Sequence, residues 1–166
     1  MDRAALGQTY QVHRRGLYAL ALAITRCPAR AEDAIHEAFA RMCSRKVQLD
    51  GDQIAYVFAS VRNAALDQQR FKNSGVKTVN VESPASMFNG HAPDPVTESE
   101  RAERDSALRK AVDALPEEQR EAIVLKVYAG LTFEQMAVTV QAPLPTVAAR
   151  YRRALDKLKQ SLGENA

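Results

Sequence analysis

The sequence predicts an all-α protein made of two small helical domains, and three observations support this fold class. Apolar residues recur at intervals of three and four along several segments, which is the spacing of amphipathic helices. Tryptophan is absent and aromatic residues make up only 6% of the chain, so Ala, Leu, Val and Ile must fill the cores, as in small helix bundles. Residues 73–96 contain Pro and Gly with little periodicity, which predicts a flexible linker between residues 1–72 and 97–166.

Three helices are predicted in residues 1–72. The first ends before Pro28 and places these residues on one face: Leu6, Tyr10, His13, Leu17, Leu20 and Ile24. The second begins near Ala29, and its apolar face is formed by Ile35, Ala38, Phe39 and Met42. A polar loop from Ser44 to Gln53 precedes the third, whose stripe is Ile54, Val57, Phe58, Val61 and Ala65. Three helices of this length make a compact bundle.

The second group of helices begins at residue 97. Thr97 and Glu100 have the spacing of a capping box, and a stripe follows at Leu108, Ala111, Val112 and Leu115. Pro116 begins the next helix, which is expected to end at Gly130 after burying Ile123, Val124, Val127 and Tyr128. Thr132 and Gln135 form a second capping box before a short helix. The last helix is predicted from Thr146 to about Leu162.

The charge distribution favours nucleic acid only weakly. Residues 1–72 carry 11 Lys/Arg against 7 Asp/Glu, residues 73–107 carry 3 against 6, and residues 108–166 carry 9 against 7. Two basic ends could attract a polyanion, although such a mild excess also suits an ordinary solvated surface. Cys27 and Cys43 lack metal-ligand spacing and are expected to be reduced thiols in the core. With no long apolar run or cleavage signature, a cytoplasmic location without membrane contact is expected.

The last two helices have the arrangement of a helix-turn-helix, in which the second helix can enter the major groove of DNA. At 100° per residue, the core-facing side of the last helix consists of Val147, Tyr151, Ala154, Leu155, Leu158 and Leu162. A different side, which we call the basic ridge, consists of Thr146, Ala149, Arg150, Arg153 and Lys157. Short residues allow close approach to DNA, and guanidinium groups can bind base edges or phosphates. A solvated basic face on an ordinary helix would have the same pattern.

The chain resembles a known family over most of its length. Leu115-Pro-Glu-Glu-Gln-Arg-Glu-Ala-Ile-Val-Leu, Gly130-Leu-Thr-Phe-Glu-Gln-Met-Ala and Arg150-Tyr-Arg-Arg-Ala-Leu-Asp-Lys-Leu resemble the fourth region of bacterial RNA polymerase sigma factors. Ala31-Glu-Asp-Ala-Ile-His-Glu-Ala-Phe-Ala-Arg-Met and Tyr56-Val-Phe-Ala-Ser-Val-Arg-Asn-Ala-Ala-Leu-Asp-Gln-Gln-Arg resemble the second region. Having only these two regions, in this order, is similar to the extracytoplasmic-function (ECF) subfamily.

The resemblance implies three groups of functional residues. Those expected to bind core RNA polymerase are Glu32, Asp33, Ile35, His36, Glu37, Phe39 and Met42. Those expected to contact the −10 promoter element are Tyr56, Arg62, Asn63, Asp67, Arg70 and Lys72, with an extruded base captured at the loop 44–53. The basic ridge is expected to contact the −35 element. The implied partners are core polymerase, promoter DNA and an anti-sigma factor, and a monomer without cofactor, metal or catalytic residues is expected.

Several alternatives stay open at this point. Phe39 could be a core residue rather than a docking residue, and Asp67 could be the partner of an arginine rather than a DNA contact. A conventional helix-turn-helix regulator would be a dimer on a palindromic site. A zinc-dependent hydrolase, suggested by His36-Glu37, is disfavoured because Ala40 stands where the motif needs its second histidine.

The turn before the last helix departs from the family pattern. Gln141 and Pro145 stand where relatives commonly have glycine, and Ala148 and Ala149 replace a lysine and a serine. Tyr56 and His36 replace the usual tryptophan and glutamine. Gln141 would be strained if its position needs a positive φ, and the two alanines remove polar contacts from the expected −35 surface.

Overall fold

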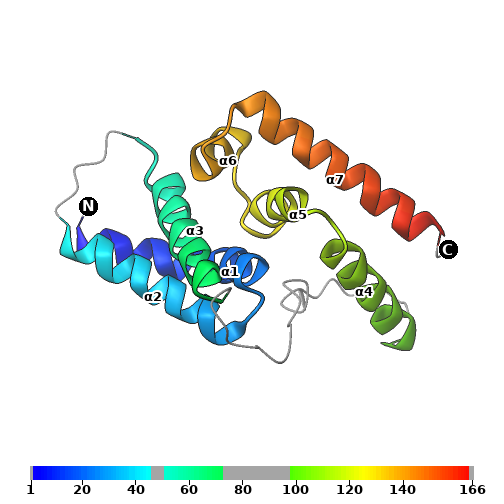
Figure 1. The fold of residues 1–166 in the computed structure, drawn as a ribbon, viewed down its shortest axis with the longest axis horizontal. Coiled ribbons are helices and arrows are strands. Elements are labelled where there is room, and N and C mark those ends of the chain that lie inside the picture. Colours follow the sequence, from blue (N-terminus) through cyan, green and yellow to red (C-terminus); the bar gives the residue numbers. More distant parts are fainter. Residues whose placement is uncertain (1, 46–50, 73–97, 165–166) are drawn as a thin grey trace.

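The computed structural model describes residues 2–45, 51–72 and 98–164, and every regular element in these ranges is a helix (Figure 1). The front bundle consists of α1 (Arg3–Thr25), α2 (Pro28–Ser44) and α3 (Gln53–Lys72). The back bundle consists of α4 (Glu98–Asp113), α5 (Glu117–Ile123), a π-helical turn (Val124–Tyr128), α6 (Phe133–Val140) and α7 (Leu144–Glu164). The all-α class is therefore confirmed. The linker 73–96 and the capping residue Thr97 lie outside the described residues, so the domain boundary stays a prediction.

Helix α1 ends where the sequence predicts. Arg26 adopts a left-handed conformation with φ 57°, and its N–H donates to the Leu22 carbonyl at 2.9 Å before Pro28 opens α2. The predicted stripe is buried at Leu6, Leu17, Leu20 and Ile24. It is wrong at Tyr10, which is 39% exposed, because its ring packs on Phe39 while the rest faces solvent. The expectation of two core thiols is also wrong, because Cys27 is only half-buried and Cys43 is exposed.

Helix α3 is capped by a residue from the predicted polar loop. The Asp52 carboxylate accepts the N–H groups of Ile54 and Ala55 at 2.8 and 3.1 Å, which satisfies two donors of the first turn. Val57, Phe58 and Val61 of the predicted stripe are fully buried. The side chain of Asp52 therefore determines where α3 begins.

The predicted helix after Pro116 contains a π-helical turn. The Ala129 N–H donates to the Val124 carbonyl at 2.9 Å, and Gly130 follows with φ +69°, as its predicted terminal position requires. Val127 was expected to be buried but is 48% exposed. A π turn holds more residues than an α turn, so it rotates the apolar stripe out of phase and directs Val127 to solvent.

The helix-turn-helix forms as predicted. Thr132 Oγ1 accepts the Gln135 N–H at 3.1 Å and Gln135 Oε1 accepts the Thr132 N–H at 2.9 Å, which confirms the second capping box. Helix α7 begins at Leu144, two residues earlier than expected. Pro145 fits inside its first turn because the N–H that proline lacks is not needed there.

Gln141 does adopt the left-handed conformation, with φ 54°. This conformation costs a residue that has a Cβ atom about 1–2 kcal/mol of folding free energy. Glycine avoids that cost, but it loses part of the gain because it has more conformational freedom than glutamine in the unfolded chain. We therefore expect Gln141→Gly to raise the free energy of unfolding by about 0.5–1 kcal/mol, measured by urea denaturation. The control is Gln11→Gly in the exposed interior of α1, which should lower it by about 1 kcal/mol. A Gln141→Gly variant no more stable than the parent would contradict the expected strain.

The two bundles share one hydrophobic core. The larger cluster of buried side chains joins Leu17 and Phe58 of the front bundle to Leu125 and Met136 of the back bundle. A smaller cluster, which includes Val112, Ile123, Ala154 and Leu158, lies between α4, α5 and α7. The two bundles therefore pack against each other through the larger cluster. Amphipathic spacing shows that a helix face is buried, but it does not show which helix covers it.

Helix α3 packs on α6, and α1 packs on the π-helical turn, so two helices of the front bundle contact the back bundle. Among the described residues, no helix combines the length and the apolar character needed to cross a lipid bilayer.

Candidate nucleic-acid interface

The basic ridge belongs to α7, which lies at the outer edge of the back bundle (Figure 1). On the opposite side of this helix, Val147 and Ala154 are buried, and Tyr151 packs edge-on against Phe133 with ring centroids 5.6 Å apart. These contacts fix the rotation of α7. The ridge residues Thr146, Arg153 and Lys157 are exposed as a result, while Ala149 and Arg150 are half-buried. Leu162 was expected on the buried side but is 36% exposed, because it lies in the last turns of the helix where less of the bundle covers it.

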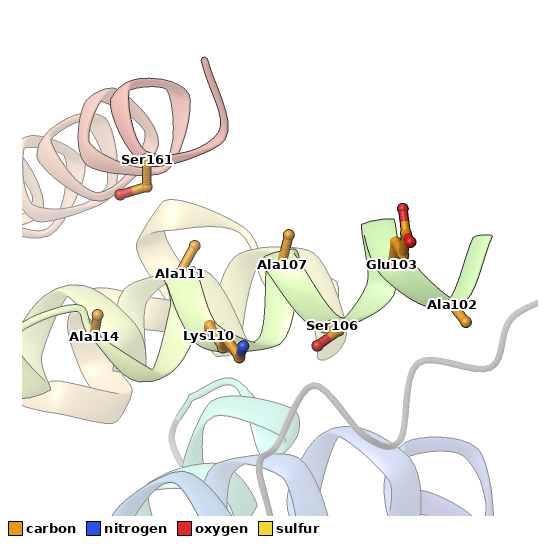
Figure 2. Close-up of a pocket in the computed structure, with 8 residues that line it drawn as sticks. All are labelled: Ala102, Glu103, Ser106, Ala107, Lys110, Ala111, Ala114 and Ser161. Carbon is orange, nitrogen blue, oxygen red and sulfur yellow. The ribbon is translucent and has the colours of Figure 1, made fainter. Parts of the chain in front are cut away.

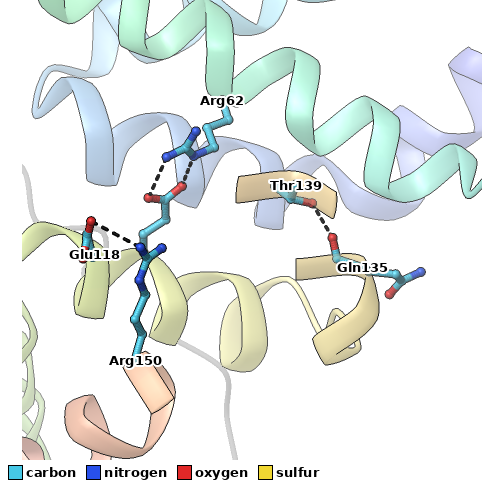
Figure 3. A network of polar contacts seen from close by, with 6 residues as sticks. Arg62, Glu118, Gln135, Thr139 and Arg150 are labelled. Atoms are coloured by element: carbon cyan, nitrogen blue, oxygen red, sulfur yellow. Dashed lines mark hydrogen bonds and ion pairs between the residues drawn. The ribbon is translucent and has the colours of Figure 1, made fainter. Parts of the chain in front are cut away.

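Arg150 is held at the edge of the ridge by an ion pair. Its guanidinium lies 3.4 Å from a carboxylate oxygen of Glu118 in α5 (Figure 3). The Glu118 side chain is exposed, so another anion can replace it as the partner of Arg150 at little cost in free energy. Arg153 and Lys157 are therefore the more accessible cations of the ridge.

An open groove runs between α4 and α7, with a volume of about 710 Å³ (Figure 2). Ala107 and Ala111 of α4 point toward Ser161 of α7, and their short side chains leave the space between the two helices open. The groove has no cluster of groups that would suit catalysis or metal binding. Across the described residues as a whole, no three His, Cys, Asp or Glu side chains are grouped in a way that could hold a metal ion.

A polar pocket of about 250 Å³ lies between α2 and α3. It is lined by Ala38, Arg41, Met42, Arg45, Tyr56, Ser60 and Asn63. Tyr56 and Asn63 were predicted −10 contacts, and the fold brings them together through their i, i+7 spacing on α3. Arg41, Arg45 and Ser60 were not predicted from the sequence. The i, i+4 spacing of Arg41 and Arg45 could have indicated that both lie on the same face of α2.

A second groove, of about 480 Å³, lies between α1 and α2. It is lined by Tyr10, Arg14, Arg15, Tyr18, Glu32, Ile35 and His36. Three of these residues belong to the predicted polymerase-binding set, whereas those from α1 were not predicted. Apolar spacing predicted a packing role for α1 that included Tyr10, but it gave no role to Arg14, Arg15 and Tyr18.

Comparisons with known proteins assign both halves of the chain. Residues 9–74 match the family Sigma-70 region 2, and residues 105–158 match Sigma-70, region 4. The ECF RNA polymerase sigma factor RpoE of Cereibacter sphaeroides is 24% identical over 97% of this chain and 88% of its own length. The ECF sigma factor SigK of Mycolicibacterium vanbaalenii is 25% identical over 98% of this chain and 84% of its own length. This chain belongs to the ECF sigma factors.

Two solved structures share the fold of this chain. The sigma factor RpoE from Bartonella quintana, solved in complex with the anti-sigma factor NepR, gives a TM-score of 0.70 at 20% identity, covering 96% of this chain and 97% of that one. CnrH, solved in complex with the cytosolic domain of CnrY, gives 0.68 at 19% identity, covering 99% and 92%. Sigma factors bind core RNA polymerase and promoter DNA and direct promoter recognition and transcription initiation. The predicted family and function are therefore confirmed.

In this sigma factor, the predicted −10 residues fall into different environments. Asn63 and Arg70 are exposed and Tyr56 is half-buried, while the side chain of Lys72 lies outside the part that the structure describes. Asp67 lies 3.9 Å from the guanidinium of Arg41 and 3.8 Å from that of Arg70. These contacts favour the alternative in which Asp67 is the partner of arginines.

Arg62 does not face open solvent as a DNA contact should. Its guanidinium makes a two-pronged ion pair with the carboxylate of Glu121 in α5 (Figure 3). The side chains of Arg62 and Glu121 are only 20% and 9% exposed. Sequence spacing placed Arg62 off the apolar stripe of α3, but it could not show that the back bundle covers this position.

The predicted polymerase-binding residues divide into two kinds. Ile35 and Met42 are buried and support the core of the front bundle. Phe39 is half-buried against Tyr10, with ring centroids 5.3 Å apart, so it contributes to packing and also reaches the surface. The polar members Glu32, Asp33 and His36 are exposed, and Glu37 is half-buried in an ion pair with Arg41.

Proposed function

We propose that the basic ridge of α7 binds the −35 element while the pocket between α2 and α3 captures an unstacked base of the −10 element. The observation that carries this proposal is the placement of Thr146, Arg153 and Lys157, which are all exposed along one side of a helix whose other side is buried. Such a helix can enter a major groove, and the short side chain of Ala149 in the ridge allows close approach. Arg153 is proposed to contact base edges and Lys157 to contact phosphate.

The pocket between α2 and α3 suits promoter melting. Tyr56 offers a ring on which a base can stack, Ser60 and Asn63 offer hydrogen-bonding groups, and Arg41 and Arg45 offer positive charge for the backbone. Removing a base from the duplex costs a few kcal/mol, which favourable contacts in such a pocket can offset. The loop residues 46–50, also proposed to take part, lie outside the described residues.

The groove between α1 and α2 is proposed as the polymerase-docking surface. It combines the exposed Glu32 and His36 with aromatic and basic residues of α1, a mixture of apolar and charged groups typical of protein interfaces. Because RpoE of Bartonella quintana was solved in complex with the anti-sigma factor NepR, we propose an anti-sigma factor as a further partner of this chain. The protein would act as a monomer in the cytoplasm, as a regulator without catalytic activity of its own.

The decisive experiment is in vitro transcription with core polymerase and a genomic library, mapping start sites that appear only when this protein is added. We expect a set of such sites that share two unlike elements upstream. Absence of new start sites at every salt concentration, together with no comigration with core polymerase, would refute the assignment. Gel filtration distinguishes the proposed monomer from the dimer that a conventional helix-turn-helix regulator would form.

Lys157→Ala should weaken duplex DNA binding and reduce the slope of log K against log salt by about one, because one phosphate contact and its released counterion are lost. Lys159 provides a matched control, since it is exposed on the same helix but lies more than 100° from the centre of the basic ridge. Lys159→Ala should leave the slope nearly unchanged. Equal slopes for the two variants would contradict the proposed orientation of α7 on DNA.

A further inference from the structure

Arg150 is the one cation of the basic ridge that has a carboxylate partner within the described part of the chain. Its Nη2 atom lies 3.4 Å from Oε1 of Glu118, which belongs to the first turn of α5 (Figure 3). The Arg150 side chain is 24% exposed, whereas that of Glu118 is 69% exposed. The pair therefore lies at the surface, at the edge of the side of α7 that is proposed to meet DNA.

Helix α5 holds Glu118 in place beside α7. Ile123 of α5 belongs to the same buried cluster as Ala154 of α7. The Arg120 guanidinium donates to the Leu115 carbonyl at 2.9 Å, which anchors α5 to the segment that precedes it. Burial is the main cause that lowers the pKa of Arg120, so this arginine belongs to the interior and not to the DNA-facing side. The backbone of Glu118 therefore has a fixed position relative to α7.

Glu118 occupies only part of the Arg150 guanidinium. This planar group has five N–H donors, and Glu118 accepts from one of its nitrogens. Its other donors can bind a base edge that presents two acceptors, such as O6 and N7 of guanine. Because the guanidinium is already held at one corner, less conformational freedom is lost when it binds a base. The ion pair thus prepares Arg150 for contact with a base edge.

The carboxylate also changes how Arg150 responds to phosphate. Binding to DNA of any sequence is driven by the counterions that leave the phosphates when cations of the protein take their place. A guanidinium that already faces a carboxylate adds little net positive charge, and a phosphate that approached it would also approach Glu118. An exposed ion pair contributes at most about fivefold to an equilibrium constant. A good two-pronged base contact discriminates about 5- to 150-fold, so the pair opposes phosphate contacts more effectively than base contacts.

We propose that Glu118 is a positioning residue for the −35 interaction, which holds Arg150 ready for a base edge and reduces its attraction to phosphate. This inference rests on the proposed binding of the −35 element by the basic ridge. Arg153 and Lys157 supply the general attraction to DNA, whereas the Glu118–Arg150 pair weakens binding to every sequence except the correct one. Glu118 therefore increases specificity although it lowers the net positive charge of the surface.

The test measures binding of the full chain to two fluorescently labelled duplexes of about 20 base pairs by anisotropy, over a series of salt concentrations. One duplex carries the −35 element of a promoter found by start-site mapping, and the other contains the same bases in shuffled order. Glu118→Gln should bind the shuffled duplex about three- to fivefold more tightly than the parent, with a slope of log K against log salt steeper by up to about one. Its affinity for the −35 duplex should rise less, so the ratio of the two affinities should fall.

Glu117→Gln is the matched control, because Glu117 is exposed in the same first turn of α5 and its substitution removes the same charge. It should change the slope and the affinity ratio much less. Glu118→Asp keeps the carboxylate and should retain most of the specificity. In an Arg150→Ala background, Glu118→Gln should have no further effect, because both substitutions remove the same pair.

Equal effects of Glu118→Gln and Glu117→Gln, or an effect of Glu118→Gln that persists without Arg150, would overturn the positioning role while leaving the −35 role of the basic ridge intact. If the parent and all variants bound the −35 duplex no better than the shuffled one, the proposed −35 role would be contradicted and this inference with it. Circular dichroism verifies that each variant is folded.

Discussion

Phe58→Ala should lower the free energy of unfolding by about 3–5 kcal/mol, the largest effect expected from a single substitution in this protein. Phe58 is fully buried in the core shared by the two bundles, and its ring packs edge-on against His13 with centroids 5.8 Å apart. Small proteins have a total stability of about 5–15 kcal/mol, so the variant would lose a large part of it. Urea denaturation followed by circular dichroism measures the change.

Phe133→Ala is the comparison for this measurement. Phe133 is half-buried on α6, where its ring contacts Tyr151 and lies under the ammonium group of Lys126, 4.6 Å from the ring centroid. Because Phe133→Ala removes less buried surface than Phe58→Ala, it should lower the free energy of unfolding by about half as much. If the two variants were equally stable, the complete burial of Phe58 in the shared core would be contradicted.

Tyr56→Ala should slow formation of the open promoter complex about 5- to 150-fold, because stacking on an aromatic side chain contributes about 1–3 kcal/mol per base. The effect is expected at any promoter identified by start-site mapping, and permanganate footprinting of unpaired thymines measures it. Tyr56 lines the pocket between α2 and α3 without belonging to the buried core. Its loss should therefore affect melting far more than folding.

Two controls separate base capture from a general defect. Tyr56→Phe keeps the stacking surface and should retain most of the activity. On a template whose −10 region is already unpaired, saturating Tyr56→Ala protein should approach the activity of the parent, because melting is no longer limiting. A defect of the same size on both templates would mean that Tyr56 acts in polymerase binding rather than in base capture.

The helices were predictable because their determinants are local. Pro28 and Pro116 mark helix starts, Gly130 marks an end, and the Thr132–Gln135 capping box forms as the sequence indicates. The strain at Gln141 was also visible, since the turn of the helix-turn-helix requires a left-handed residue there. Val127 and Leu162 were predicted to be buried but are exposed. The π-helical turn rotates Val127 towards solvent, and Leu162 lies near the end of α7, where less of the bundle covers it.

The functional surfaces were predicted only in part. Spacing on α7 determined which of its sides faces the core, and the exposed Thr146, Arg153 and Lys157 follow from that. Pockets, in contrast, need two helices at once. Arg41 and Arg45 on α2 meet Tyr56 and Asn63 on α3 only because the bundle sets these helices side by side, and no spacing within one helix contains that information.

The sequence by itself determined the family, the order of the two regions, the positions of nearly all helix ends and the side of α7 that carries the basic ridge. These features depend on residues within a few turns of one another, and local periodicity records them. Only the tertiary structure decided that Gly16 meets Ala129, that Glu121 covers Arg62, and that one core joins both bundles. Such contacts join residues that are far apart along the chain. Their free energy depends on how the surfaces of several helices fit together, which local periodicity does not record.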